Sequence, residues 1–302
     1  VKTYDSSQST TALVLSDTTS GTNYSFQSSY YVNDSLLFDE LYLDPFQFVD
    51  AVKYSKWDRN IIGMNPLLKV AAKINNANAP YNTFLDQYSE ERGFEKVFSI
   101  YNSTKKINFD GEVLLGGDNL EKYKGDLVTL DFEEREISDT TSRSGIFTGL
   151  FVDLTGLKFI HGIKNSDKKV QNYTLQLISP SVLTKVNVDI DFLQQESLTL
   201  PSQAYSRLLK HFGILQISDT FSCFLASPDH DYLEFNFTGQ IITLPFKNLY
   251  PEEGDDDCWL DLSLLAKSYS DSELWFGFYA LGYLYTKYDF TSSTVSYGYL
   301  ND

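Results

Sequence analysis

The sequence predicts an all-β protein of two lobes with a few short helices, and three observations support this prediction. Aromatic residues make up 15% of the 302 residues, supplied mainly by 21 Tyr and 22 Phe, and such side chains suit the half-buried surface of a sheet. Apolar runs of strand length alternate with turns rich in Ser, Thr, Asn and Gly. Two successive blocks each contain many such runs and one clear helix, which indicates two β lobes.

The first block is expected to form an N-terminal lobe over residues 1–135. Its strand-like runs are TTALVL, YSFQSSYYV, LLFDELYL, KVFSIYNS, EVLLGGD and YKGDLVTLDF. The turn TKKINFDG separates KVFSIYNS from EVLLGGD, so these two runs predict a hairpin. A helix is expected within residues 81–94, where Phe84, Leu85 and Tyr88 share one face and Gly93 ends the helix.

The second block is expected to form a C-terminal lobe over residues 146–302. The charged run EEREISDTTSRSG breaks the periodicity before it and predicts the boundary between the lobes. Strands are expected in IFTGLFVDLTGLKFI, in YTLQLI and through most of the C-terminal part. The helix of this block is predicted in SQAYSRLLKHFG, with Ser202 as its cap and Gly213 as its stop.

The charge of the chain excludes one class of partner. Its formal net charge is −17 and it has no basic stripe, so it repels the phosphate backbone of nucleic acids. No apolar run approaches the roughly 20 residues that a membrane-spanning helix needs. Because Val1 opens on a polar stretch, no leader peptide is recognisable, and a secreted protein is expected here in processed or trimmed form.

Cysteines and sequons indicate an oxidising, secretory compartment. Cys223 and Cys258 lie in strand-like segments separated by the turns SPDHD and PEEGDDD, which favours a disulfide; two buried free thiols are the alternative. Five Asn-x-Ser/Thr sequons predict glycosylation, at Asn23, Asn33, Asn102, Asn172 and Asn236.

No cofactor or metal is expected from the remaining residues. His161, His211 and His230 lie far apart in the sequence, and none has a partner at metal-ligand spacing. The acidic run at 252–257 lacks the alternating spacing of a calcium loop. The sequence also contains no phosphate-binding loop and no serine or cysteine nucleophile motif.

Several motifs resemble the pepsin-like aspartic proteases, in the order in which that family has them. The stretch VFSIYNSTKKINFDGEVLLGGDNLEKYKGDLVTLDF matches the family pattern at six positions, which are Gly116, Gly117, Asp118, Tyr123, Gly125 and Leu127. TYDSSQSTTALVL and NIIGMNP resemble earlier family segments, while TLPSQAYSRLLKHFG, the segment from Cys223 to Cys258, and WFGFYALGYLYTKYDFTSSTVSYGY resemble later ones. The order and the cysteine spacing are most similar to the fungal yapsin and candidapepsin branch.

This resemblance implies a bilobal fold and two catalytic aspartates, one from each lobe, that share a proton and activate a water molecule. The first aspartate of the family precedes the stretch that TYDSSQS resembles, so it is expected before Val1 or on a separate N-terminal chain of the same protein. By spacing from Pro201, Phe192 stands where the second aspartate belongs, and Leu193 and Gln194 replace the hydroxyl residue and the Gly.

Two interpretations of this second loop remain open. Asp189 and Asp191 are either a displaced catalytic pair or acids on a divergent strand.

The family also closes a Tyr- and Gly-containing flap over its substrate. The corresponding stretch here, SFQSSYYVND, has no Gly; Gln27 falls near the Tyr position, Tyr30 or Tyr31 are substitutes for it, and Asn33 places a glycan beside it.

The sequence therefore predicts a pseudoprotease of the secretory pathway, either secreted or held at the cell surface or cell wall. Its cleft between lobes is expected to bind a peptide, a protein or a glycan without cutting it. The first alternative is a divergent aspartic endopeptidase whose first aspartate lies on the N-terminal segment. The second is a structural cell-wall or surface glycoprotein with no ligand in the cleft.

Overall fold

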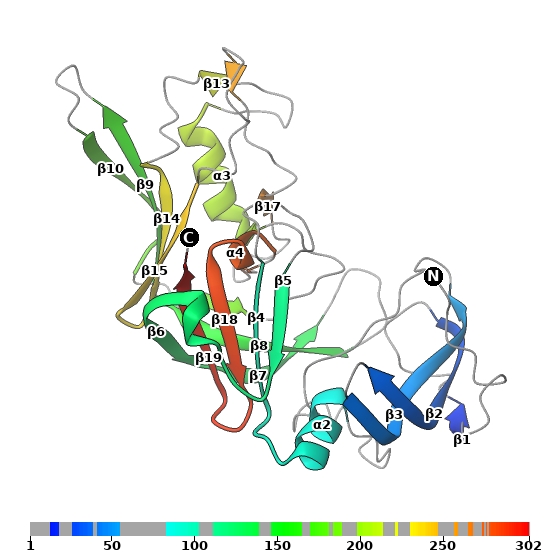
Figure 1. Cartoon of the computed structure of the whole chain (residues 1–302). Helices are drawn as coiled ribbons and strands as arrows, with labels where there is room; N and C mark the ends of the chain where they lie inside the picture. Colours follow the sequence, from blue (N-terminus) through cyan, green and yellow to red (C-terminus); the bar gives the residue numbers. More distant parts are fainter. Residues whose placement is uncertain are drawn as a thin grey trace. The chain divides into compact units, whose positions relative to one another are not determined.

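A computed structural model describes residues 13–17, 26–38, 41–54, 83–102, 111–138, 146–164, 170–180, 184–188, 198–213, 221–222, 230–246, 257–258, 265–267, 274, 276 and 278–301 (Figure 1). The chain divides into two compact units. One comprises Val1–Phe98, Glu134–Gly149 and Asp289–Ser292, and the other comprises Ser99–Glu133, Leu150–Tyr288 and Ser293–Asp302. Residues 99–133 thus group with the second unit, and the predicted lobes, 1–135 and 146–302, stay a prediction.

The first unit contains an antiparallel sheet of three strands, β1 (Leu13–Asp17), β2 (Phe26–Phe38) and β3 (Leu41–Tyr54), with β2 in the middle. The run LLFDELYL, expected as one strand, instead belongs to two. Phe38 of β2 pairs with Leu41 of β3, so the chain reverses between them. The prediction was wrong because apolar residues on both sides of the acidic pair Asp39–Glu40 read as one uninterrupted strand.

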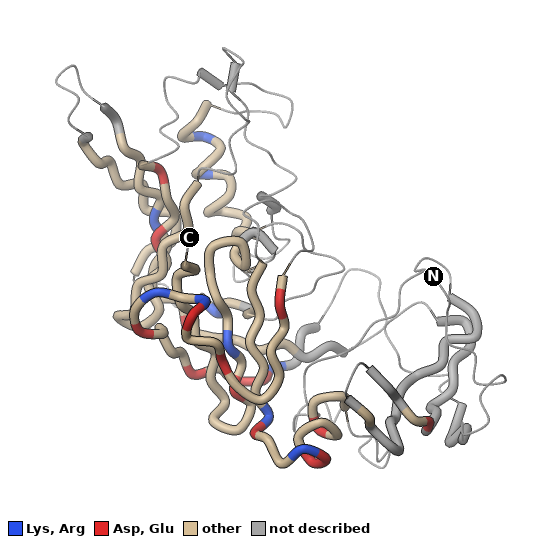
Figure 2. Tube along the Cα trace, in the orientation of Figure 1, with Lys and Arg blue, Asp and Glu red and all other residues tan. Residues whose placement is uncertain are grey.

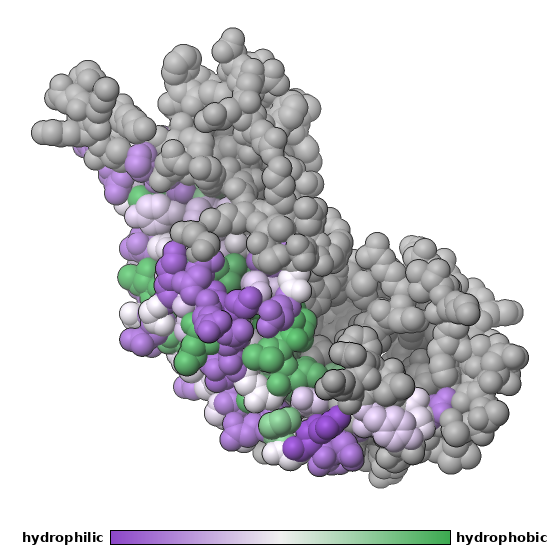
Figure 3. All heavy atoms as spheres, viewed as in Figure 1, coloured by the Kyte–Doolittle hydropathy of each residue, from purple (hydrophilic) through white to green (hydrophobic). Residues whose placement is uncertain are grey.

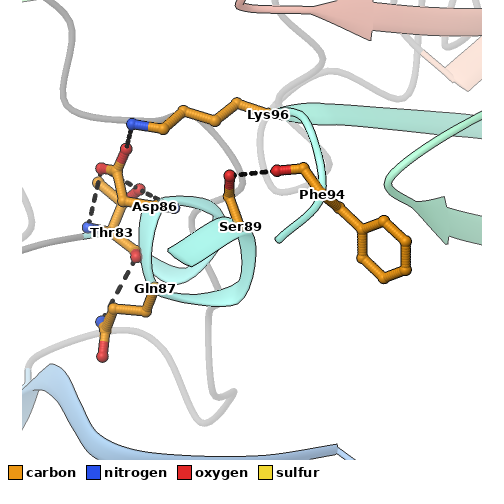
Figure 4. A network of polar contacts seen from close by, with 6 residues as sticks. All are labelled: Thr83, Asp86, Gln87, Ser89, Phe94 and Lys96. Atoms are coloured by element: carbon orange, nitrogen blue, oxygen red, sulfur yellow. Dashed lines mark hydrogen bonds and ion pairs between the residues drawn. The ribbon is translucent and has the colours of Figure 1, made fainter. Parts of the chain in front are cut away.

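Helix α2 (Phe84–Arg92) confirms the helix predicted within residues 81–94. Its start is a capping box, in which Thr83 Oγ1 accepts a bond from Asp86 N at 3.4 Å and Asp86 Oδ2 accepts one from Thr83 N at 3.2 Å (Figure 4). Lys96 Nζ binds the other carboxylate oxygen of Asp86 at 2.5 Å. The helix ends at Gly93, whose φ of 69° lies in the left-handed region that a residue without Cβ adopts most readily.

A five-stranded sheet lies mostly in the second unit. Its strands, in spatial order, are β5 (Gly111–Leu115), β4 (Val97–Asn102), β18 (Leu284–Asp289), β19 (Thr294–Leu300) and β6 (Tyr123–Asp131), with the short 3-10 helix η2 (Leu120–Lys122) before β6. β4 and β5 lie side by side, as the predicted hairpin requires. Gly125, part of the family-like pattern, has φ 70°, and the β6–β19 register shifts between Tyr297 and Tyr299, so a Gly serves an irregular point of the ladder.

A four-stranded sheet in the same unit carries helix α3 (Ser202–His211). Its strands, in order, are β10 (Val170–Ile178), β9 (Gly156–Lys164), β14 (Tyr232–Phe237) and β15 (Gln240–Pro245). The helix prediction is confirmed, but Ser202 is the first helical residue and not the cap. Pro201 takes the cap position and makes no side-chain cap bond, because its ring has no oxygen that could accept one.

The remaining strands form small ladders. They are the sheet β11 (Thr184–Asn187), β8 (Ile146–Leu154) and β7 (Glu133–Ser138), the pair β12 (Leu198–Leu200) and β17 (Leu265–Lys267), and the pair β13 (Phe221–Ser222) and β16 (Asp257–Cys258); α4 (Phe278–Leu281) is a single turn. β7 corrects the expectation that EEREIS breaks the periodicity, since pairing with β8 outweighs its charge. The run IFTGLFVDLTGLKFI is two strands, β8 and β9, divided at Thr155.

One face of the described part of the protein mixes hydrophilic and apolar residues (Figure 3). On the face shown in Figure 3, apolar residues appear in patches separated by hydrophilic ones. Acidic and basic residues are mixed along η2 and β6, where the charged residues are Glu121, Lys122, Lys124, Asp126 and Asp131 (Figure 2). Such interspersed charge favours a surface that stays in water.

Candidate functional site

The predicted second-lobe loop lies between two segments that the structure describes. Asp189, Asp191, Phe192 and Gln194 themselves lie outside the described residues. The strand before the loop is β11 with Val188, and the strand after it is β12, followed by Pro201 and α3. These flanking segments are the described part of the candidate site.

Val188, the last described residue before the loop, is held on both sides of its backbone. Its N–H donates to the carbonyl oxygen of Leu150 at 2.8 Å, continuing the β11–β8 ladder by one step. Its carbonyl oxygen accepts a bond from the phenol of Tyr288 on β18. Val188 is 0% exposed and Tyr288 2%. Because these groups are buried, both backbone atoms of Val188 need a protein partner. The two bonds therefore hold the chain in place where it enters the predicted loop.

The chain leaves the loop through an equally buried strand. β12 pairs in parallel with β17, with Leu198 opposite Leu265 and Leu200 opposite Lys267. Leu198 and Leu200 are both 0% exposed. A three-residue strand with both apolar side chains buried fits the near-continuous apolar pattern of parallel ladders. The described segments on both sides of residues 189–197 are therefore buried in the hydrophobic core.

A lysine bridges two carboxylates beside this entry strand. Lys185 Nζ on β11 lies 2.7 Å from Glu133 Oε1 on β7 and also binds Asp153 Oδ1 on β8. Burial acts to lower the pKa of Lys185, but its bonds to Asp153 and Glu133 act the other way and leave that pKa above its ordinary value. Lys185 thus stays cationic and links all three strands of the sheet.

Gln27, Tyr30 and Tyr31 of the predicted flap lie on the central strand of the three-stranded sheet in the first unit. Gln27, Tyr30 and Tyr31 are part of β2, where Tyr30 pairs with Asp17 of β1 and with Asp50 of β3. Backbone pairing on both sides restrains this part of the strand. Their role as a flap stays a prediction.

A short antiparallel ladder lies at the two cysteines. β13 and β16 pair antiparallel, with Phe221 opposite Cys258 and Ser222 opposite Asp257. Cys223 follows Ser222 directly in the sequence but lies outside the described residues. The ladder supports the disulfide, because it joins the two cysteine-bearing segments, and the bond itself stays a prediction.

The five sequons differ in how accessible their Asn side chains are. Asn23 lies outside the described residues, and for Asn33 the structure describes only the backbone, in β2. Asn172 on β10 is exposed, Asn236 is half-buried, and Asn102 is 4% exposed. A glycan needs a solvent-facing Asn, so burial is an argument against Asn102 and exposure supports Asn172.

The structure brings together residues that the sequence kept apart. His161 and His211, 50 positions apart, have ring centroids separated by 5.6 Å, and Asp231 binds His161. The third histidine, His230, precedes Asp231. The sequence signal for the contact of His161 with His211 is limited to the alternation of β9, which puts Phe159 and His161 on one face. Within the described ranges, no group of three or more His, Cys, Asp or Glu side chains is arranged to hold a metal ion.

Comparisons with known proteins support the fold and the family. A model of the family "Eukaryotic aspartyl protease" matches residues 1–158, just over half of the chain. An acid protease of Saccharomycopsis fibuligera is 28% identical over 168 residues, covering 54% of this chain and 37% of that protein. The chain therefore aligns with little more than a third of that relative's length.

A solved structure extends the likeness to nearly the whole chain. The aspartic proteinase of Irpex lacteus superposes with a TM-score of 0.63 and 16% identity, covering 99% of this chain and 85% of that one. At this identity the match shows the fold alone, and it confirms the predicted pepsin-like all-β fold. The chain belongs to the eukaryotic aspartyl protease family. Among the described residues, no helix is long and apolar enough to cross a membrane.

Proposed function

We propose that this chain belongs to a secreted, glycosylated pepsin-like protein that binds a peptide, a protein or a glycan in its cleft and does not cut it. Family membership supports the general class. The substitutions in the second-lobe loop support the loss of cleavage, and the cysteine and sequon pattern supports the secretory pathway, with release or retention at the cell surface or wall.

Two observations together carry the proposal: the segments on both sides of residues 189–197 are buried in the core, and the sequence between them departs from the family pattern. Val188 and the strand Leu198–Leu200 are fully built into the core, as a working loop requires. Between them, Phe192 stands at the expected aspartate position and Gln194 at the Gly position. An aromatic ring cannot share a proton or activate water, whereas it can contact an apolar ligand. The attachment is thus compatible with binding and the loop chemistry opposes cleavage.

The test is a peptide-cleavage assay on the full-length protein, including any segment before Val1, from pH 3 to pH 7. We expect no pepstatin-sensitive cleavage, and calorimetric binding of substrate-like peptides that weakens at least several-fold in Phe192→Ala. Loss of binding would follow from removing the apolar area that the ring is proposed to bury against the ligand. Asp126→Asn, an exposed change on β6, serves as the control and leaves binding unchanged.

A second candidate function is a divergent aspartic endopeptidase, favoured by Asp189 and Asp191 immediately beside Phe192. It needs its other aspartate from a preceding or separate N-terminal chain. Acid-dependent cleavage that pepstatin blocks, and that Asp189→Asn or Asp191→Asn abolishes, would replace the first proposal with this one. If the protein does not cleave peptides and Phe192→Ala does not change binding, the results would instead favour a structural cell-wall or surface glycoprotein.

A further inference from the structure

Helix α3 rests on one face of the four-stranded sheet through aromatic rings. Because side chains alternate along a strand, β9 presents Phe159 and His161 on one face, and their rings stack at 6.1 Å. Phe212, which follows the helix, contacts Phe159 at 5.4 Å and Phe246 at 6.0 Å. All three Phe are nearly fully buried. The C-terminal end of α3 therefore packs against an apolar, aromatic surface.

His211 is the last residue of α3 and adds a titratable ring to this surface. It meets Phe159 edge-on at 5.7 Å and His161 at 5.6 Å, while another side of it is exposed to solvent. A proton can therefore reach His211 from water, although much of its surroundings is apolar. An imidazolium in that position loses part of its hydration, which opposes its protonation.

His161 is held in a buried polar contact. Its Nδ1 lies 2.8 Å from Asp231 Oδ1, and the same oxygen accepts the N–H of Gly162 at 3.0 Å. The side chains of His161 and Asp231 are 5% and 0% exposed. The carboxylate orients the His161 ring, so His211 faces a partner that cannot turn away. The two imidazoles repel each other when both carry a proton.

Among the described residues, the ionisable groups around α3 other than Asp231 offer His211 little compensation. The helix itself carries only basic charged residues, Arg207 and Lys210 (Figure 2). Arg207 is engaged with the carbonyl of Leu177 on β10, and Tyr173 of β10 pairs with His161 across the ladder. On the opposite face of the sheet, Lys158 pairs with Glu234 at 2.5 Å. The remaining titratable residues on the packed elements are Lys164 of β9, Tyr232 of β14, Tyr205 of α3 and Lys267 of β17.

We propose that His211 is a proton-sensitive contact that holds the C-terminal turn of α3 on the sheet at neutral pH and weakens that attachment in acid. The oriented pair of His161 and Asp231 is its receiving surface. The attachment strengthens when His211 is neutral, because the ring then packs against Phe159 as an aromatic group. This inference stands on the fold alone, whether or not the protein cuts peptides.

The direction of the pH dependence follows from linkage. Burial first, and then the charge of His161, lower the pKa of His211 below its ordinary value of 6.5, against a smaller opposite effect of Asp231. The unfolded or detached state therefore binds the proton more readily than the packed state. The stabilisation is fully present above pH 6.5 and is lost as the pH falls through the lower pKa of the packed state.

Hydrogen exchange tests the proposal on the full chain. Protection factors of the amides at 208–213 are compared with those of β14 at pH 7.5 and pH 5.0. In the wild type we expect the ratio to fall in acid by up to about tenfold per unit of pKa difference. In His211→Gln we expect the ratio to stay constant. The control variant His230→Gln removes the histidine that precedes Asp231 in the sequence, and we expect it to behave as the wild type.

Two results would overturn the proposal. One is an equal acid response in the wild type and in His211→Gln, and the other is loss of the response in His230→Gln. If His211→Gln does not fold, NMR titration of the His211 ring in the wild type decides instead. A midpoint below that of free histidine supports the contact, and a midpoint at or above it contradicts the contact.

Discussion

At the scale of the residue, Val188 illustrates how a buried peptide group determines where a loop begins. Both of its polar backbone atoms are bonded, to Leu150 and to Tyr288, from strands far away in the sequence. Burial makes each bond necessary, because an unpaired carbonyl there would have no water to bind. The phenol of Tyr288 is thus a positioning group for the segment that enters the 189–197 loop.

The change Tyr288→Phe removes that donor and keeps the ring. We expect the free energy of unfolding to fall by about 1–3 kcal/mol, because the buried carbonyl of Val188 loses its partner. Urea or guanidinium titration measures this loss. The matched control is Tyr299→Phe, whose exposed hydroxyl bonds Thr243 N at 2.8 Å and Thr243 Oγ1 at 2.9 Å. Water replaces those bonds, so a control loss as large as that of Tyr288→Phe contradicts the argument.

At the scale of the element, α2 shows how local bonds establish a helix whose apolar periodicity is weak. Phe84 and Leu85 are buried at its start, and the capping box satisfies the first backbone donors. Asp86 also receives Lys96 from the segment before β4, so one carboxylate joins the helix start to the following strand. Its position in the first turn further suits the positive end of the helix dipole.

The change Thr83→Ala tests the cap. We expect a loss of about 1 kcal/mol in the free energy of unfolding, as is typical when a Thr cap is removed. Thr83→Ser keeps the hydroxyl that bonds Asp86 and should stay within about 0.5 kcal/mol of the wild type. Chemical denaturation of both variants makes the comparison. Equal losses in the two variants would mean that the methyl group, and not the hydroxyl, stabilises the helix.

At the scale of the whole molecule, strand position determines which sequons face solvent. Asn172 lies on β10, at the edge of its sheet, and is exposed, while Asn102 lies on β4 between two neighbours and is 4% exposed. A glycan on an edge strand would also hinder pairing with another chain.

Expression in a glycosylating host tests this difference together with the secretory proposal. We expect Asn172→Gln to lower the mass of the secreted protein by one N-glycan and Asn102→Gln to leave it unchanged. Mass spectrometry before and after enzymatic deglycosylation gives the measurement. A glycan found on Asn102, or none on Asn172, would contradict the assignment by exposure.

Much of the fold could be predicted because its signals are local. The ends of α2 follow from Thr83 and Gly93, and most strands follow from apolar runs between turns. Errors arose where pairing overrode the local pattern, as for EEREIS in β7 and for the hairpin between Phe38 and Leu41. In both, the deciding partner is another strand, which a window of a few residues does not contain.

For the candidate site, the sequence by itself determined the chemistry of the loop, since Phe192 and Gln194 are identities that no fold can change. It also determined the all-β class, through composition and periodicity. Only the tertiary structure decided that Tyr288 holds Val188 and that His161, His211 and Asp231 meet. Those contacts join segments dozens of residues apart, and they exist because packing of strands and helices, not sequence spacing, brings such side chains within bonding distance.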